Sequence, residues 1–157
     1  MLGLYLGIGT IKTRKEARRF IDEGADFIVG PTVNEEVGAA AENAKLLWIP
    51  GCMTPTEMAT AEAAGADTVK IFPGNLLGPG YIKAVAELFP NLKMMPTGGV
   101  EAEENNLRGW FGAGVVAVGM GSKLISKEAI QNGNYEGLKT AVAKALQLVK
   151  QVTSPAA

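Results

Sequence analysis

The chain of 157 residues is long enough for one domain with a hydrophobic core, and its 15 basic and 16 acidic side chains give a formal net charge of -1. It contains no histidine and one cysteine, which excludes imidazole catalysis, ordinary zinc catalysis and an internal disulfide. The balanced charge gives no footprint for nucleic acid. Neither a membrane-spanning run nor a signal peptide is recognisable, so we expect a cytoplasmic protein without a membrane partner.

Short apolar segments alternate with helical stretches along the whole chain. The predicted strands cover residues 4–10, 27–31, 46–51, 68–74, 93–99 and 115–122. This alternation predicts a parallel sheet with helices outside it, in an α/β architecture. Related phrases around Gly24, Gly65 and Gly112 recur after 41 and 47 residues, about two βα units each time, which indicates a (β/α) TIM-type barrel. Six of the usual eight βα units are present.

The junctions between strands and helices carry capping signals. Three threonines each precede a glutamate by three residues, the spacing of a capping box. These pairs are Thr13 with Glu16, Thr32 with Glu35, and Thr54 with Glu57. Each of the three repeated glycines is predicted to end a helix. We expect residues 1–151 to form one barrel domain, short at its N-terminal side, followed by a frayed tail at residues 152–157.

The predicted strand 68–74 contains a lysine within an apolar run. Because strand residues alternate between faces, Val69 and Ile71 share one side, and Lys70 shares the other with Phe72. A lysine directed into the barrel loses hydration, so its pKa falls and it can act as a neutral amine nucleophile toward a carbonyl. The alternative is a lysine that extends to water or pairs with an acid.

Two glycine-rich turns follow the last two predicted strands, at residues 96–101 and 119–124. Backbone amides at such turns bind anions, and barrels commonly bind phosphate at the loops after their last two strands. Glycines in tight turns are an equally ordinary explanation. Cys52 has no basic partner in the sequence and is predicted to be a small packed side chain.

Six phrases, in order, resemble the bacterial 2-keto-3-deoxy-6-phosphogluconate (KDPG) and 4-hydroxy-2-oxoglutarate (KHG) aldolases: GIGT, FIVGP, IPGCMTPTE, KIFPG, PTGGV and AVGMGS. The likeness covers Gly3 to about Gln151. It implies a cytoplasmic class I aldolase with no cofactor and no metal, a homotrimer that cleaves a keto acid to pyruvate. The lysine of KIFPG, which is Lys70, would be the catalytic residue that forms the Schiff base.

The same resemblance implies further site residues. Those that would bind the substrate are Thr10, Pro31, Phe72 and Thr97. Those that would bind its phosphate or distal carboxylate are Gly98, Gly99, Gly121 and Ser122.

The chain departs from the family pattern in two respects. The family has two further strands before GIGT, and the second supplies a proton-transferring glutamate and a substrate-binding arginine that are not found here, so we expect the C-terminal three quarters of such an aldolase. Asn75 stands where relatives more often have an acid. Two rival functions stay open: an inactive scaffold that keeps only the anion site, and a phosphate-binding isomerase or synthase. The sequence does not choose between phosphorylated and dicarboxylate substrates.

Overall fold

The computed structural model describes residues 4–154, whose backbone divides into two compact units. The first contains residues 4–72 and 88–94, and the second contains residues 73–87 and 95–154. In chain order the elements are β1 (Gly7–Ile8), α1 (Arg14–Asp22), β2 (Phe27–Val29), α2 (Glu35–Asn43), β3 (Leu47–Ile49), β4 (Gly51–Cys52), α3 (Pro55–Ala63), β5 (Thr68–Ile71), α4 (Gly74–Ala86), β6 (Lys93–Pro96), α5 (Glu104–Phe111), α6 (Lys127–Gln131) and α7 (Tyr135–Thr153). Strands and helices alternate as predicted.

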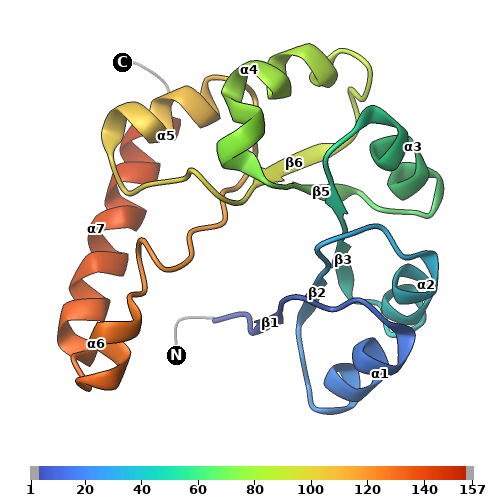
Figure 1. Cartoon of the computed structure of the whole chain (residues 1–157), viewed down its shortest axis with the longest axis horizontal. Helices are drawn as coiled ribbons and strands as arrows, with labels where there is room; N and C mark the ends of the chain where they lie inside the picture. Colours follow the sequence, from blue (N-terminus) through green and yellow to red (C-terminus); the bar gives the residue numbers. More distant parts are fainter. Residues whose placement is uncertain (1–3, 155–157) are drawn as a thin grey trace. The chain divides into compact units, whose positions relative to one another are not determined.

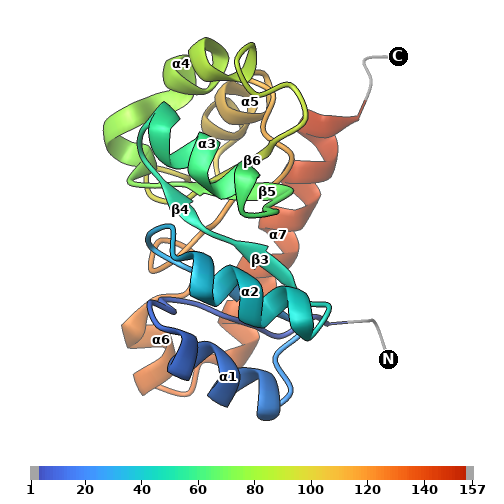
Figure 2. The same cartoon turned by 90° about the vertical axis from the view of Figure 1, so that its right-hand side faces the viewer.

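The strands of the first unit are parallel. β1, β2 and β3 pair in that order, and β4 pairs with β5. Pro50 divides the predicted strand 46–51 into β3 and β4, because proline has no N–H to donate to a neighbouring strand. The start of β6 continues the sheet, since the N–H of Lys93 donates to the carbonyl oxygen of Asp67 (2.9 Å). Helices α1 and α2 lie side by side in both views (Figure 1 and Figure 2).

Two of the three predicted capping boxes are present and one is wrong. Thr13 and Thr54 accept the backbone N–H of the glutamate three residues on, and those glutamates reach back to the cap backbone. At α2 the cap is Asn34, whose Oδ1 accepts from the N–H of Glu36 (2.9 Å), so Thr32 has no capping role. Asn34 is fixed there because its Nδ2 also donates to the carbonyl oxygen of Lys12 (2.9 Å).

All three predicted glycines stand at a helix end, but two of the three make the left-handed turn there. Gly24 (φ +91°) and Gly65 (φ +87°) adopt the left-handed conformation that glycine tolerates without strain. Gly112 does not, because it keeps a helical φ of -67° at the end of α5. Gly114 (φ +101°) makes that turn two residues later.

In the second unit, α5 and α6 both pack against the long α7 (Figure 1). Helix α4 is interrupted at Gly78, where φ is +71°. The predicted strand 115–122 is wrong: a single parallel bridge between Thr97 and Gly119 replaces a ladder. A strand is held by continuous pairing with neighbours. This segment instead borders a mainly apolar groove of about 430 Å³ on α7.

The predicted tail is partly helical. Helix α7 runs to Thr153 and so includes residues 152 and 153, and the hydroxyl of Ser154 donates to the carbonyl oxygen of Lys150 (2.7 Å). The threonine hydroxyl of residue 153 also donates back into the helix. Residues 155–157 of the predicted tail lie outside the described residues.

Candidate active site

Lys70 lies on the accessible face of β5, as the alternation predicts. Its neighbours Val69 and Ile71 are fully buried on the other face, with 0% exposure each. Lys70 is half-buried and Phe72, two residues on, is exposed. The buried pair anchors the strand through the hydrophobic effect, and this anchoring directs the lysine to the opposite face.

The environment of Lys70 is apolar rather than ionic. Burial lowers the pKa of the Lys70 ammonium below its ordinary value. Its Nζ lies 4.4 Å from the centroid of the Phe72 ring, within the range of a cation–π contact. Among residues 4–154, its side chain forms no ion pair or hydrogen bond, so the alternative of an acid-paired lysine is wrong for the described residues. Deprotonation of Lys70 would therefore leave no carboxylate unpaired.

Pro31 lies beside the strand that pairs with Lys70. The N–H of Lys70 donates to the carbonyl oxygen of Pro50 (2.8 Å), and Gly51 is the register partner of Lys70. A Cβ at Gly51 would overlap with the backbone carbonyl of Pro31. The glycine thus permits Pro31 to approach the strand next to the lysine, which agrees with a shared site.

Thr10 follows β1 at the carboxyl edge of the parallel sheet β1-β2-β3. Its φ is +64°, which is rare for a β-branched residue and costs on the order of 1–3 kcal/mol. Such strain occurs preferentially at functional sites. Its side chain is exposed, and the following residue, Ile11, donates its N–H to the carbonyl oxygen of Val29 (3.2 Å). Thr10 thus follows the first strand and Pro31 follows the second strand of the sheet β1-β2-β3, whereas Lys70 lies on β5 of the sheet β4-β5-β6.

Thr97 and the first glycine turn belong to the second unit, and this turn requires glycine. Gly98 (φ +92°) and Gly99 (φ +70°) both have left-handed conformations. A Cβ at Gly99 would lie 2.8 Å from the Cα of Asn75. The N–H of Gly74 donates to the carbonyl oxygen of Thr97 (2.8 Å). The start of α4 therefore packs directly on the first glycine turn, and Asn75 is the residue of α4 that lies against Gly99.

Side chains of α5 fix the far side of this turn, a feature that the sequence analysis missed. The carbonyl oxygen of Gly99 accepts from Asn106 Nδ2 (3.0 Å) and Trp110 Nε1 (3.4 Å). Asn106 Oδ1 accepts from the N–H of Glu101 (3.1 Å). One asparagine thus holds both ends of the turn, and nothing in the spacing of residues 99, 101 and 106 alone indicates this.

The second glycine turn begins next to the first. The bridge between Thr97 and Gly119 places these residues side by side, and the N–H of Gly119 donates to the carbonyl oxygen of Pro96 (2.8 Å). Beyond it, Gly121 and Ser122 are exposed, and a Cβ at Gly121 would meet no atom within 4 Å. The two turns are adjacent, as an anion site at the ends of neighbouring strands requires.

An ion pair joins the two glycine turns. Lys123 Nζ lies 3.2 Å from Glu101 Oε1, and the lysine side chain is 74% exposed. An exposed pair of this kind contributes little to stability. It links the second glycine turn, which contains Lys123, to Glu101 at the end of the first, and the sequence analysis did not single it out.

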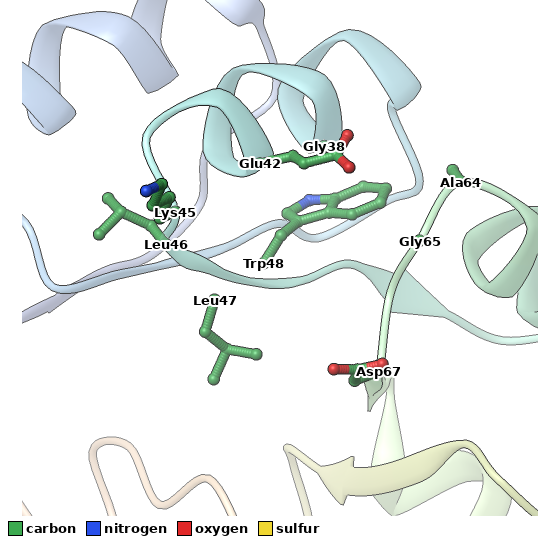
Figure 3. Close-up of a pocket in the computed structure, with 9 residues that line it drawn as sticks. All are labelled: Gly38, Glu42, Lys45, Leu46, Leu47, Trp48, Ala64, Gly65 and Asp67. Atoms are coloured by element: carbon green, nitrogen blue, oxygen red, sulfur yellow. The ribbon is translucent and has the colours of Figure 1, made fainter.

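A further pocket of the first unit lies at the opposite ends of the strands (Figure 3). Its volume is about 230 Å³, and the Trp48 indole lies beneath α2 on one side of it, with Asp67 on another. Trp48 is buried, and its Nε1 has no hydrogen-bond partner among the residues that the structure describes. Leu47 begins β3 and Asp67 directly precedes β5, so this pocket borders the amino ends, whereas barrel active sites lie at the carboxyl ends.

Cys52 and the capping glutamates are explained without catalysis. Burial raises the pKa of the Cys52 thiol to about 12, so it is a packed, unreactive side chain as predicted. The N–H groups of Met53 and Thr54 donate to Glu57 (2.8 Å each) and lower its pKa. Within residues 4–154 there is no cluster of three or more histidine, cysteine or acidic residues that could hold a metal ion, and no described helix meets the length and hydropathy needed to cross a membrane.

Comparison with known proteins gives a consistent result. Residues 2–141 match the family model for KDPG and KHG aldolase. The chain is 38% identical over 120 residues to 2-dehydro-3-deoxy-6-phosphogalactonate aldolase of Escherichia coli, covering 76% of this chain but only 58% of that relative.

Solved structures with the same fold include two aldolases. A 4-hydroxy-2-oxoglutarate/2-dehydro-3-deoxyphosphogluconate aldolase from TTHB1 superposes with a TM-score of 0.80 at 37% identity, covering 94% of this chain and 70% of that one. KDPG aldolase from Legionella pneumophila, captured with pyruvate as a covalent carbinolamine, superposes with a TM-score of 0.77 at 28% identity over 94% of this chain and 68% of that one. The fold is the TIM-type (β/α) fold.

Proposed function

The chain belongs to the KDPG and KHG aldolase family, and from that premise we propose that it acts as a class I aldolase whose Lys70 forms a Schiff base with a 2-keto acid. The observation that carries the proposal is the half-buried amine of Lys70, which has no acid partner within residues 4–154, on the accessible face of a parallel strand. Burial favours its neutral form, and the neutral amine is the nucleophile that the reaction needs.

The chemistry proceeds through an imine and needs no metal. The Nζ lone pair attacks the keto carbon, and loss of water from the carbinolamine leaves a protonated imine. Removal of the proton from the C4 hydroxyl breaks the C3–C4 bond, releases an aldehyde and moves the bonding electrons into the iminium to form an enamine. Protonation of the enamine carbon, followed by addition of one water molecule, releases pyruvate and restores Lys70.

The remaining site residues have binding roles in this proposal. Phe72, Pro31, Thr10 and Thr97 would contact the keto acid, and the backbone amides of the two glycine turns would bind its far anion together with Ser122. Two observations support this role: the two glycine turns are adjacent, and Gly121 and Ser122 of the second turn are exposed. One relative at 38% identity is named for a phosphorylated 2-keto-3-deoxy sugar acid and one at 37% identity is named for both substrate classes, so we propose the phosphorylated acid as the substrate to test first.

The test is a cleavage assay that follows pyruvate release from 2-dehydro-3-deoxy-6-phosphogalactonate, the corresponding gluconate and 4-hydroxy-2-oxoglutarate. We expect one of the phosphorylated acids to be cleaved fastest. Lys70→Arg should abolish cleavage, whereas Lys93→Arg, on an exposed residue at the start of β6, should retain it. Unchanged cleavage by the Lys70→Arg variant would contradict the role of Lys70, and no cleavage of any of the three acids by the unchanged protein would favour the isomerase or synthase alternative.

A second candidate is a protein that forms the imine but turns over slowly. It rests on the observation that no carboxylate in residues 4–154 forms an ion pair or hydrogen bond with the Lys70 side chain. Proton transfer by a positioned group is worth about 10² to 10⁴ in rate, so its loss would slow turnover without preventing imine formation. Imine formation with pyruvate release at least about 10²-fold below that of the Escherichia coli relative would identify this case.

The assembly and location of the protein are part of the same proposal. Family resemblance supports a homotrimer and a cytoplasmic location. Sedimentation equilibrium would give three times the mass of the 16.4 kDa chain for a trimer. A monomer under the same conditions would contradict that assignment, and cell fractionation with an antibody would test the location.

A further inference from the structure

The Phe72 ring lies against the Lys70 amine in a cation–π arrangement. The two side chains share a face because they are two residues apart on an extended strand. The Nζ lies 4.4 Å from the ring centroid. Phe72 is 39% exposed, so its ring is accessible to solvent and to a ligand that approaches the amine.

The elements around β5 offer no competing charge at contact distance. On β4 the nearest titratable group is Cys52, a buried thiol with its pKa raised to about 12 and therefore uncharged. On α3 the carboxylate of Glu57 is bound by backbone N–H groups. Asp67 precedes β5 and the exposed Lys93 begins β6, and neither forms an ion pair in the described residues.

Two effects of opposite sign therefore act on the protonation of Lys70. The apolar surroundings disfavour the charged ammonium, because they replace part of its hydration. The negative face of an aromatic ring favours the ammonium over the amine, because only the cation is attracted to it. The balance of these two effects decides at which pH the nucleophile appears.

We infer that Phe72 is a positioning residue whose π face holds Lys70 as an ammonium in the free protein and thereby sets the pH above which Lys70 becomes a nucleophile. Its importance for catalysis rests on the proposed aldolase function, but its effect on the protonation of Lys70 does not. A keto acid that enters the site has to displace this contact before the amine attacks.

Substitutions of Phe72 separate the π face from the apolar bulk. Phe72→Leu keeps apolar cover and removes the ring, so the pKa of Lys70 should fall by about 0.5 unit, the size of a partly exposed cation–π contact. Phe72→Tyr keeps the ring and should leave the pKa of Lys70 within about 0.2 unit of its value in the unchanged protein. Phe72→Ala removes cover as well as the ring, so it should admit water and move the pKa upward relative to Phe72→Leu.

The experiment is an NMR titration of the whole chain labelled with ¹³C-lysine, in which the Lys70 Cε signal is assigned by its disappearance in Lys70→Arg. The other lysine signals in each sample are the internal control and should not change between variants. Phe72→Met is a second apolar variant in case Phe72→Leu does not fold. A fall in both apolar variants, with Phe72→Tyr unchanged, supports the inference; an equal or higher pKa in the apolar variants overturns it.

A second readout separates this inference from the proposed function. The pH dependence of pyruvate trapping by borohydride should move to lower pH in Phe72→Leu by the same amount as the NMR titration. A shifted titration without trapping at any pH would leave the inference supported and refute the aldolase function. Trapping with an unchanged pH profile and an unchanged titration would support the aldolase function and refute the role of Phe72.

Discussion

The two candidate regions of this protein differ in what their function depends on: a side chain in one and the backbone in the other. Around Lys70, function depends on a side chain whose protonation is set by apolar neighbours, with Val69 and Ile71 fully buried behind it. At the glycine turns, function depends on backbone conformation, with Gly98 and Gly99 in left-handed geometry beneath Asn75. The first region is therefore sensitive to changes in packing and polarity, whereas the second is sensitive to the addition of a single methyl group.

The largest expected effect comes from breaking the packing behind Lys70. Ile71→Ala removes a fully buried side chain from β5 and should lower the free energy of unfolding by about 2–5 kcal/mol. Leu88→Ala, at a residue 65% exposed, removes a comparable side chain and should change it by less than about 0.5 kcal/mol. Urea unfolding of both variants measures the difference. Equal effects would show that β5 is not anchored by its buried face.

A smaller effect is expected from adding one methyl group to the first glycine turn. Gly99→Ala forces a left-handed φ and a contact of 2.8 Å with the Asn75 Cα, so it should cost about 1–3 kcal/mol and weaken binding of inorganic phosphate. Gly121→Ala, where a Cβ meets open space, should leave the free energy of unfolding within about 0.5 kcal/mol. Calorimetry and urea unfolding test the pair. Identical free energies of unfolding for the two variants would refute the claim that the backbone conformation of this turn requires glycine.

The smallest change in the free energy of unfolding is expected at a helix cap near the Lys70 region. Thr54 caps α3 close to β4, and Thr54→Ala should cost about 1 kcal/mol. Thr32→Ala should cost far less, because Asn34 rather than Thr32 caps α2. The same urea unfolding measurement distinguishes them. An equal loss of unfolding free energy in the two variants would mean that Thr32 caps α2, as the sequence predicted, and would contradict the assignment of Asn34.

The sequence predicted what depends on short-range pattern. The alternation of β5, the capping boxes at Thr13 and Thr54, and the turns at Gly24 and Gly65 follow from spacing within a few residues, and all are confirmed. Adjacent glycine turns were likewise predicted, from the order of the strands, and the bridge at residues 97 and 119 confirms their adjacency. Their role in binding an anion stays a prediction.

The features that the sequence did not predict depend on contacts between distant residues. Asn34 caps α2, and a hydrogen bond to the backbone carbonyl oxygen of Lys12, 22 residues away, holds its side chain in place. The segment 115–119 has high strand propensity, but propensity makes no strand without a continuous pairing partner, and only one bridge forms. No local pattern indicates that Asn106 holds both ends of the first glycine turn.

The most direct test of the central claim is mass spectrometry after treatment of the intact chain with pyruvate and borohydride. We expect the protein to gain the mass of pyruvic acid less one oxygen atom, with the modified peptide carrying the reduced adduct on Lys70. Lys70→Arg should gain nothing and Lys93→Arg should react fully. Modification at another lysine, or an unmodified chain alongside a modified Escherichia coli relative treated identically, would contradict the assignment of Lys70 as the imine-forming nucleophile of this protein.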